Sequence, residues 1–166
     1  MVEGTLAETP SSEPAQVDAY REAIKGGRAD AYWYVSLVGL RPQNPIRIFR
    51  RVEKGLAFQA FVRFQRITGL SMGDLAEAVA IKPRTLARRK QQGRLEPEES
   101  DRLLRLSRIF GKALELFEGD AEAARQWLAT PQRGLGGERP MVLVKTDLGA
   151  REVEALVDRL EHGVLN

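Results

Sequence analysis

Residues 70–95 contain two short amphipathic segments separated by a tight turn, and this pairing restricts the fold more than any other part of the chain. Met72, Leu75 and Val79 recur at helical spacing and predict a first helix with one apolar face. Pro83 suits the first position of a second helix, because an N–H there would have no partner inside the helix. A short buried helix followed by an exposed one is typical of a helix-turn-helix, whose second helix enters the DNA major groove.

The second helix, predicted over residues 83–92, is rich in cations and has no acidic residue. The candidate DNA-contacting residues are Lys82, Arg84, Thr85, Arg88, Arg89 and Lys90. Arg84 and Arg88 share one face because residues four apart are neighbours on a helix. We expect one arginine to bind guanine through two hydrogen bonds and the others to hold phosphates. Two alternatives remain: Thr85 only caps or packs, or the segment is the solvated basic face of an ordinary helical hairpin.

Charge is distributed unevenly along the 166 residues, although the net charge is only +3. Residues 41–94 hold thirteen Lys and Arg against three Asp and Glu, whereas residues 1–40 have a net charge of −3 and residues 95–166 one of −4. The basic third contains the predicted helix-turn-helix, and clustered positive charge is typical of phosphate contact. DNA would repel the acidic last third, which is therefore expected to meet a different partner.

The composition argues against several classes of site. There is no cysteine, and His162 is the only histidine, so neither a metal site nor a Ser-His triad is expected. No carboxylate pair or nucleophile has a setting that suggests catalysis, so we expect no catalytic residue, no cofactor and no enzyme. The glycine-rich residues 130–138 lack the Gly-Lys-Ser/Thr ending of a phosphate-binding loop. No apolar run is long enough to span a membrane and the acidic start is not a signal peptide, which predicts a cytoplasmic protein without a membrane partner.

Helical spacing recurs through the rest of the chain and predicts an all-α fold. The further predicted helices cover residues 16–25, 46–54, 56–68, 97–117, 121–128, 141–144 and 147–162. We expect Gly111 to bend or break the longest of them, because glycine weakens a helix interior. Asp147 is expected to cap the last helix. Residues 32–38, which are aromatic and β-branched, are expected to form either a strand or an apolar segment that packs on a partner.

These elements suggest three parts. They are a flexible N-terminal segment over residues 1–40, a helix-turn-helix DNA-binding domain over residues 41–112, and a small helical domain over residues 113–166. A single helix-turn-helix contacts too few base pairs for useful specificity, so we expect a homodimer on two half-sites. The segment 32–40 and the apolar faces of the C-terminal helices are both candidate dimer interfaces.

Two blocks of sequence resemble a known family. Residues 84–110 contain Arg-Thr-Leu-x-Arg-Arg and Glu-Ser-Asp-Arg-Leu, and residues 123–163 contain Trp-Leu-x-x-Pro and Gly-Ala-x-x-Val. In this order they resemble the Xre/MbcA/ParS antitoxins over residues 45–163, and most of all the Xre antitoxin of RES–Xre toxin–antitoxin modules. One departure is Lys82, where such sequences often have a serine able to cap the recognition helix, and Pro83 takes over part of this helix start.

The resemblance implies an Xre-type helix-turn-helix domain that represses its own operon as a dimer, followed by a domain that binds and blocks a toxin. In these type II modules the toxin is a RES-domain protein that resembles ADP-ribosyltransferases and consumes NAD. The candidate toxin-binding residues are Leu135, Arg151, Glu154, Asp158, Arg159, His162, Val164, Leu165 and Asn166. The charged ones lie on the outer face of the last helix, and residues 164–166 form a tail that is expected to enter the toxin's dinucleotide cleft, or else only frays.

Two functions therefore compete on the sequence. The first is an antitoxin that blocks an NAD-consuming RES-domain toxin and binds operator DNA. The alternative is a helix-turn-helix transcriptional regulator whose C-terminal domain senses a small ligand in an apolar pocket.

Overall fold

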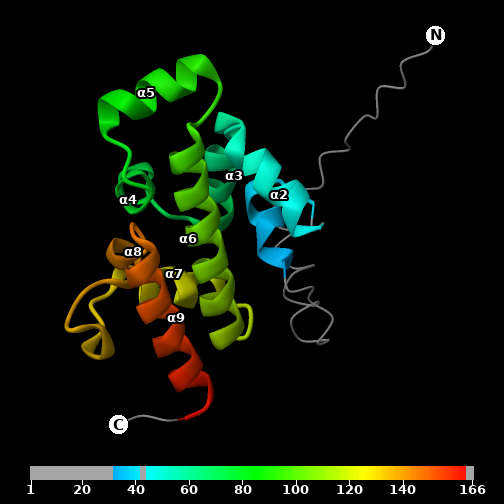
Figure 1. Cartoon of the computed structure of the whole chain (residues 1–166). Helices are drawn as coiled ribbons and strands as arrows, with labels where there is room; N and C mark the ends of the chain where they lie inside the picture. The colour runs from blue at the N-terminus through cyan, green and yellow to red at the C-terminus, as the bar shows by residue number, and fades with distance from the viewer. Residues whose placement is uncertain (1–31, 42–43, 164–166) are drawn as a thin grey trace.

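The computed structural model describes residues 32–41 and 44–163, which form a helical body without a β-strand in that part of the chain (Figure 1). The elements are η1 (Trp33–Val38), α2 (Pro45–Glu53), α3 (Phe58–Thr68), α4 (Met72–Ala78), α5 (Pro83–Gln92), α6 (Pro97–Leu116), α7 (Ala121–Ala129), η2 (Arg133–Leu135), α8 (Pro140–Leu143) and α9 (Asp147–Glu161). The predicted all-α class is confirmed. In these two ranges no helix has both the length and the apolar composition needed to cross a bilayer. The helix predicted over residues 16–25 lies outside the described residues.

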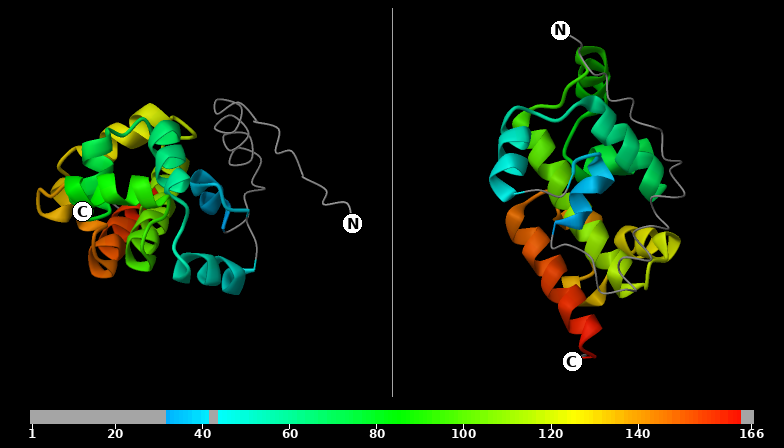
Figure 2. Two further views of the ribbon diagram at one scale, coloured as in Figure 1. Left: turned by 90° about the horizontal axis from the view of Figure 1, so that it is seen from above. Right: turned by 90° about the vertical axis from the view of Figure 1, so that its right-hand side faces the viewer.

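Helix α6 is the central element, and helices from both predicted domains pack on it. It contacts η1, α2, α7 and α9, which lie around it (Figure 2). The side chains that it buries are Leu103, Leu106, Ile109, Phe110, Ala113 and Leu114. One continuous core runs from Phe61 in α3 to Val153 in α9. The helix-turn-helix and the C-terminal helices therefore share a core instead of forming two separate ones.

Residues Trp33–Val38 form a 3₁₀ helix that is part of this core, so the prediction of a strand or a partner-binding segment is wrong. Trp33 and Leu37 are buried, and η1 packs on α3 and α6. The predicted domain boundary at residue 40 is corrected for the same reason, because this part of the N-terminal segment belongs to the folded body. With most of its apolar side chains buried, η1 is also not a free dimer interface.

Helix α6 passes through Gly111 without interruption, contrary to the predicted bend or break. A Cβ at Gly111 would lie 3.2 Å from both the Trp33 ring and the Tyr34 Cβ. The glycine therefore lets η1 lie directly on the helix. The Trp33 ring N–H donates to Glu115 Oε1 one turn further on, at 3.0 Å, which holds the same contact. The packing of η1 therefore explains the glycine at position 111, which helix propensity alone would disfavour.

The helix starts are mostly those that the sequence predicts. Ser71 accepts a hydrogen bond from the Asp74 amide at 3.0 Å, as expected for the cap of α4. For α9 the predicted cap is one residue too late: Thr146 is the cap and accepts from the Gly149 amide at 3.0 Å, while Asp147 is the first helical residue. Its negative charge still suits the positive end of the helix dipole.

Gly149 fixes the position of α9, which leads to a prediction. An added Cβ would meet the Leu143 carbonyl oxygen of α8 at 2.1 Å, so Gly149→Ala forces the backbones of α8 and α9 apart. We expect it to lower the free energy of unfolding by about 1–3 kcal/mol, measured by urea denaturation. Gly73→Ala in α4 is the matched control, because its nearest neighbour is Ser71 Oγ at 4.0 Å and helix propensity favours alanine by about 1 kcal/mol. Equal midpoints for the two variants would contradict this account of the α8–α9 contact.

Candidate functional site: a basic helix and a C-terminal partner surface

Helices α4 and α5 have the arrangement of a helix-turn-helix. Leu75 and Val79 are buried, which holds α4 in the core. Ala80 has a positive φ of 54° and turns the chain sharply before Ile81 enters the core. Helix α5 then lies at one end of the molecule, away from the end where α9 terminates (Figure 1). Of all its side chains only Arg89 is buried, so α5 offers most of its surface to solvent.

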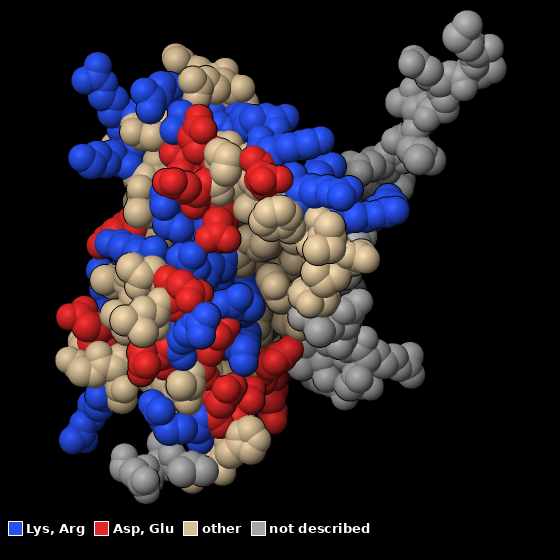
Figure 3. All heavy atoms as spheres, in the orientation of Figure 1, with Lys and Arg blue, Asp and Glu red and all other residues tan. Residues whose placement is uncertain are grey.

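The cations of α5 are available for contact with a partner. Lys82, Arg84, Arg88 and Lys90 are exposed, and in the described part of the chain none of them has a hydrogen bond or an ion pair through its side chain. Thr85 is half-buried. Lys and Arg side chains gather at the end of the molecule that α5 forms (Figure 3). An exposed cationic helix without acidic residues is the arrangement that binding to phosphates and base edges requires.

Arg89 has a different environment, which corrects its expected role as a DNA contact. Its side chain is only about 9% exposed, and its guanidinium binds the Glu99 carboxylate through Nε at 2.8 Å and Nη2 at 3.0 Å. Glu99 in turn accepts from the Glu96 amide at 2.8 Å, as part of the capping box that starts α6. Arg89 therefore holds α5 on the first turn of α6, with Glu99 as its buried partner.

Both members of this pair are charged at neutral pH. Burial disfavours the carboxylate and raises the pKa of Glu99, but the hydrogen bond from Arg89 and the one from the Glu96 amide together bring that pKa below its usual value. The pKa of Arg89 is raised, mainly by its hydrogen bond to Glu99. A bidentate pair of this kind fixes orientation as well as distance.

At the other end of the molecule, α9 packs on α6 through an apolar stripe and two ion pairs. Arg108 of α6 donates to Glu154 at 2.6 Å, and Lys112 donates to Asp158 at 3.2 Å. Glu154 and Asp158 were expected to be unpaired on a free outer face, and that part of the prediction is wrong, while their contact with a toxin stays a prediction. Both carboxylates help to hold α9 on α6.

The outer face of α9 presents other residues. Arg151 pairs on the surface with Asp147 at 2.9 Å, whereas Arg159 is exposed and has no partner in the described ranges. His162 is exposed, and its Nδ1 lies 2.7 Å from the Asp158 carbonyl oxygen.

Besides those of α9 and its C-cap His162, the predicted toxin-binding residues are Leu135 and residues 164–166. Leu135 is half-buried in the glycine-rich loop and packs against the core. Residues Val164, Leu165 and Asn166 lie outside the described residues.

Leu148 is a candidate contact residue that the sequence analysis missed. It is 72% exposed, an unusual position for a large apolar side chain, and it lies in the first turn of α9. The sequence signal was present, because Leu148 falls outside the stripe formed by Val153, Leu156 and Val157. At 3.6 residues per turn, Leu148 and Arg159 are about three whole turns apart and so share one outward face.

An exposed basic helix in a helix-turn-helix, joined through α6 to a second helical module, is the architecture of a DNA-binding regulator. Residues 48–108 match the family model of the antitoxin Xre-like helix-turn-helix domain. Residues 112–163 match that of the antitoxin Xre/MbcA/ParS C-terminal toxin-binding domain. The two matches meet inside α6.

Similar proteins agree with both matches. The antitoxin Xre of Yersinia enterocolitica is 34% identical over 130 residues, which cover 78% of this chain and 88% of the relative. The antitoxin Xre of Photorhabdus laumondii is 33% identical over 116 residues, covering 69% and 78%, and that of Pseudomonas putida is 35% identical over 121 residues, covering 72% and 74%. The chain belongs to the Xre antitoxin family: it is an antitoxin of a toxin–antitoxin system and not an enzyme.

The buried pair leads to a prediction about stability. Arg89→Met leaves Glu99 buried without a counter-charge and is expected to lower the free energy of unfolding by about 3–5 kcal/mol at pH 7. The double variant Arg89→Met, Glu99→Leu is expected to recover part of this loss, because no uncompensated charge remains. Arg88→Met, on the exposed face, is the matched control and is expected to be nearly neutral.

The pH dependence has a defined sign. A carboxylate with a lowered pKa stabilises the folded state above its unfolded pKa of about 4.3, and this stabilisation is lost as the pH falls through the lower folded pKa. The difference in the free energy of unfolding between wild type and Arg89→Met should therefore become smaller in acid. Urea denaturation at several pH values measures it, and a difference that stays constant down to pH 2 would show that the ion pair is not its source.

Proposed function

We propose that this chain is the antitoxin of a type II module whose toxin is an NAD-consuming RES-domain protein, and that it represses its own operon. The repression is supported above all by α5, which is exposed, cationic and held in a fixed orientation by Arg89 and Glu99. The toxin class is supported by the resemblance of residues 45–163 to the antitoxins of RES–Xre modules. Neutralisation and repression would then be carried by opposite ends of one molecule.

In the proposed DNA complex, α5 lies in the major groove with Arg84 and Arg88 toward the bases and Lys82 and Lys90 toward the phosphates. Bidentate hydrogen bonds to guanine supply sequence specificity, and phosphate contacts supply affinity without specificity. A homodimer places two copies of α5 about one helical turn of DNA apart. Such a dimer would bind a two-fold symmetric operator.

In the proposed toxin complex, the outer face of α9 covers the mouth of the toxin's dinucleotide cleft and the tail beyond Gly163 enters it. Leu148 supplies an apolar contact at one end of this face, and Arg159 supplies a planar cation three turns on. Glu154 and Asp158 contribute indirectly, because their ion pairs with α6 hold the helix in place.

The alternative, a regulator with a small-ligand pocket, has less support. In the described residues no buried side-chain polar atom lacks a hydrogen-bond partner, so no such group awaits a ligand. Two clefts, one between α2 and the end of η1 and one between α2, α6 and the start of α9, are lined largely by charged side chains, unlike a typical ligand pocket, which is mostly apolar.

The DNA prediction concerns the exposed arginines. We expect Arg84→Ala with Arg88→Ala to weaken binding to the module's own promoter by about 1–3 kcal/mol for each base-contacting arginine and to reduce discrimination against unrelated DNA. Electrophoretic mobility shift and footprinting measure both effects, and footprints should show two half-sites about 10 base pairs apart. The matched control is Arg125→Ala with Arg133→Ala, which removes the same charge outside the helix-turn-helix. Unchanged promoter affinity in the α5 variant would refute the assignment.

The toxin prediction concerns the outer face of α9. We expect Leu148→Ser with Arg159→Glu to weaken toxin binding by about 2 kcal/mol, or about 30-fold, and to reduce protection when both proteins are co-expressed. Met72→Ser with Arg125→Glu is the matched control, since it changes an exposed apolar residue and an arginine away from this face. A second variant ends at Gly163 and tests the tail without touching the core. If both variants bind the toxin as wild type does, α9 and the tail are not the inhibitory surface.

A further inference from the structure

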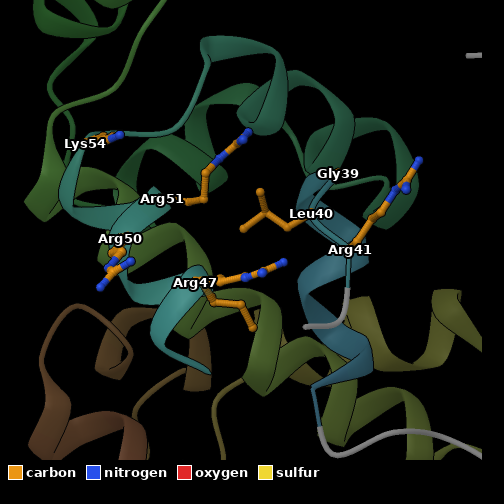
Figure 4. Close-up of a pocket in the computed structure, with 8 residues that line it drawn as sticks. Gly39, Leu40, Arg41, Arg47, Arg50, Arg51 and Lys54 are labelled. Carbon is orange, nitrogen blue, oxygen red and sulfur yellow. The ribbon is translucent and has the colours of Figure 1, made fainter. Parts of the chain in front are cut away.

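A basic cleft lies between α2 and the end of η1 (Figure 4). It has a volume of about 520 Å³ and is lined by Gly39, Leu40, Arg41, Arg47, Ile48, Arg50, Arg51 and Lys54. The lining therefore includes four arginines and a lysine but no acidic residue. We call it the α2 cleft.

Three of the five cations that line the α2 cleft, Arg47, Arg50 and Arg51, belong to helix α2. Ile48 and Val52 are buried and hold α2 in place, which leaves Arg47 and Arg51 together on another side because they are four residues apart. Figure 4 shows both side chains extending toward Leu40 across the cleft. Arg50, which also lines the cleft, lies on the other side of α2 from Leu40.

These arginines have no counter-charge in the molecule as described. None of Arg41, Arg47, Arg50 and Arg51 has a side-chain hydrogen bond or an ion pair with a described residue, and all four are exposed. By comparison, Arg89, Arg105, Arg108, Arg125 and Arg151 each pair with a carboxylate. Like charges held together without compensation create a positive potential that attracts an anion.

The α2 cleft adjoins the DNA-binding helix. Arg94, just beyond α5, donates from Nη1 to the carbonyl oxygens of Lys54 and Gly55, both at 3.0 Å. These bonds fix the C-terminal end of α2 next to the end of α5. In Figure 3 the Lys and Arg side chains continue along the same edge of the molecule from α5 to α2. Two cationic surfaces that adjoin in this way suit one extended polyanion better than two separate ligands.

We propose that the α2 cleft holds the phosphate backbone of duplex DNA beside the bases contacted by α5. This inference rests on the proposed DNA binding. The planar fork of arginine matches a phosphate group, and a contact to phosphate fixes the position of the protein on the duplex without adding sequence information. Helix α2 thus acts as a second support that sets the angle at which α5 enters the groove. A protein partner is a weaker candidate, because α2 lies outside the matched toxin-binding domain at residues 112–163.

The test uses the full chain and the salt dependence of DNA binding. Each phosphate contact contributes about 0.9 to the slope of log affinity against log salt, so Arg47→Gln with Arg51→Gln should make the slope shallower by about 1.8 per protomer, or about 3.6 for the proposed homodimer. Between 50 and 200 mM salt the dimeric variant should therefore lose about 150-fold less affinity than wild type does. The affinity that the substitution itself removes should be equal for promoter DNA and for unrelated DNA. Arg125→Gln with Arg133→Gln is the matched control for net charge and should keep the wild-type slope.

A second variant separates charge from packing. Arg47→Lys with Arg51→Lys keeps both positive charges and should retain the wild-type slope, and circular dichroism melting should show all variants folded because these side chains have no internal partners. An unchanged slope in the glutamine variant, or a loss confined to toxin binding, overturns the inference. If Arg84→Ala with Arg88→Ala leaves promoter binding intact, the proposed function fails instead. The two failures are therefore distinguishable.

Discussion

The burial of α6 is the constraint on which the rest of this structure depends. A helix of 20 residues that packs against η1, α2, α7 and α9 needs apolar residues on more than one face. Its buried serines satisfy polar groups that this packing removes from water: Ser100 accepts from the Leu56 amide at 2.8 Å, and Ser107 donates to the Leu104 carbonyl at 2.7 Å. The first turn of α6 orients the basic helix through Glu99, and its second half positions α9 through Arg108 and Lys112.

The sequence predicts most elements because hydrophobic spacing reports directly which side of a helix is buried. The bounds of α5 at residues 83–92 and the cap at Ser71 agree with the structure, since proline and serine act locally. The failures involve contacts between distant segments. Nothing near Gly111 in the sequence indicates that Trp33 packs on it, and nothing near Trp33 indicates a 3₁₀ helix in place of a strand.

The candidate site could be predicted only in part, for the same reason. Arg84, Arg88 and Arg89 have the same local character in the sequence, yet Arg89 alone faces a buried carboxylate ten residues away. Glu154 and Asp158 look like free surface acids until α6 supplies Arg108 and Lys112 beside them. A capping-box glutamate at the start of the next helix was the available signal for Arg89, because it places a carboxylate next to the end of α5. The α9 pairs had no such local signal.

The shared core also has a consequence for turnover in the cell. One continuous core joins α3 to α9 through α6, so global unfolding disrupts both halves of the described chain together. Proteases that act on opened chains respond to the population of the unfolded state, and here that state has lost both surfaces together. One degradation event therefore removes the toxin-binding domain and the helix-turn-helix at the same moment. The rate at which the antitoxin is degraded then sets both the release of the toxin and the loss of DNA binding.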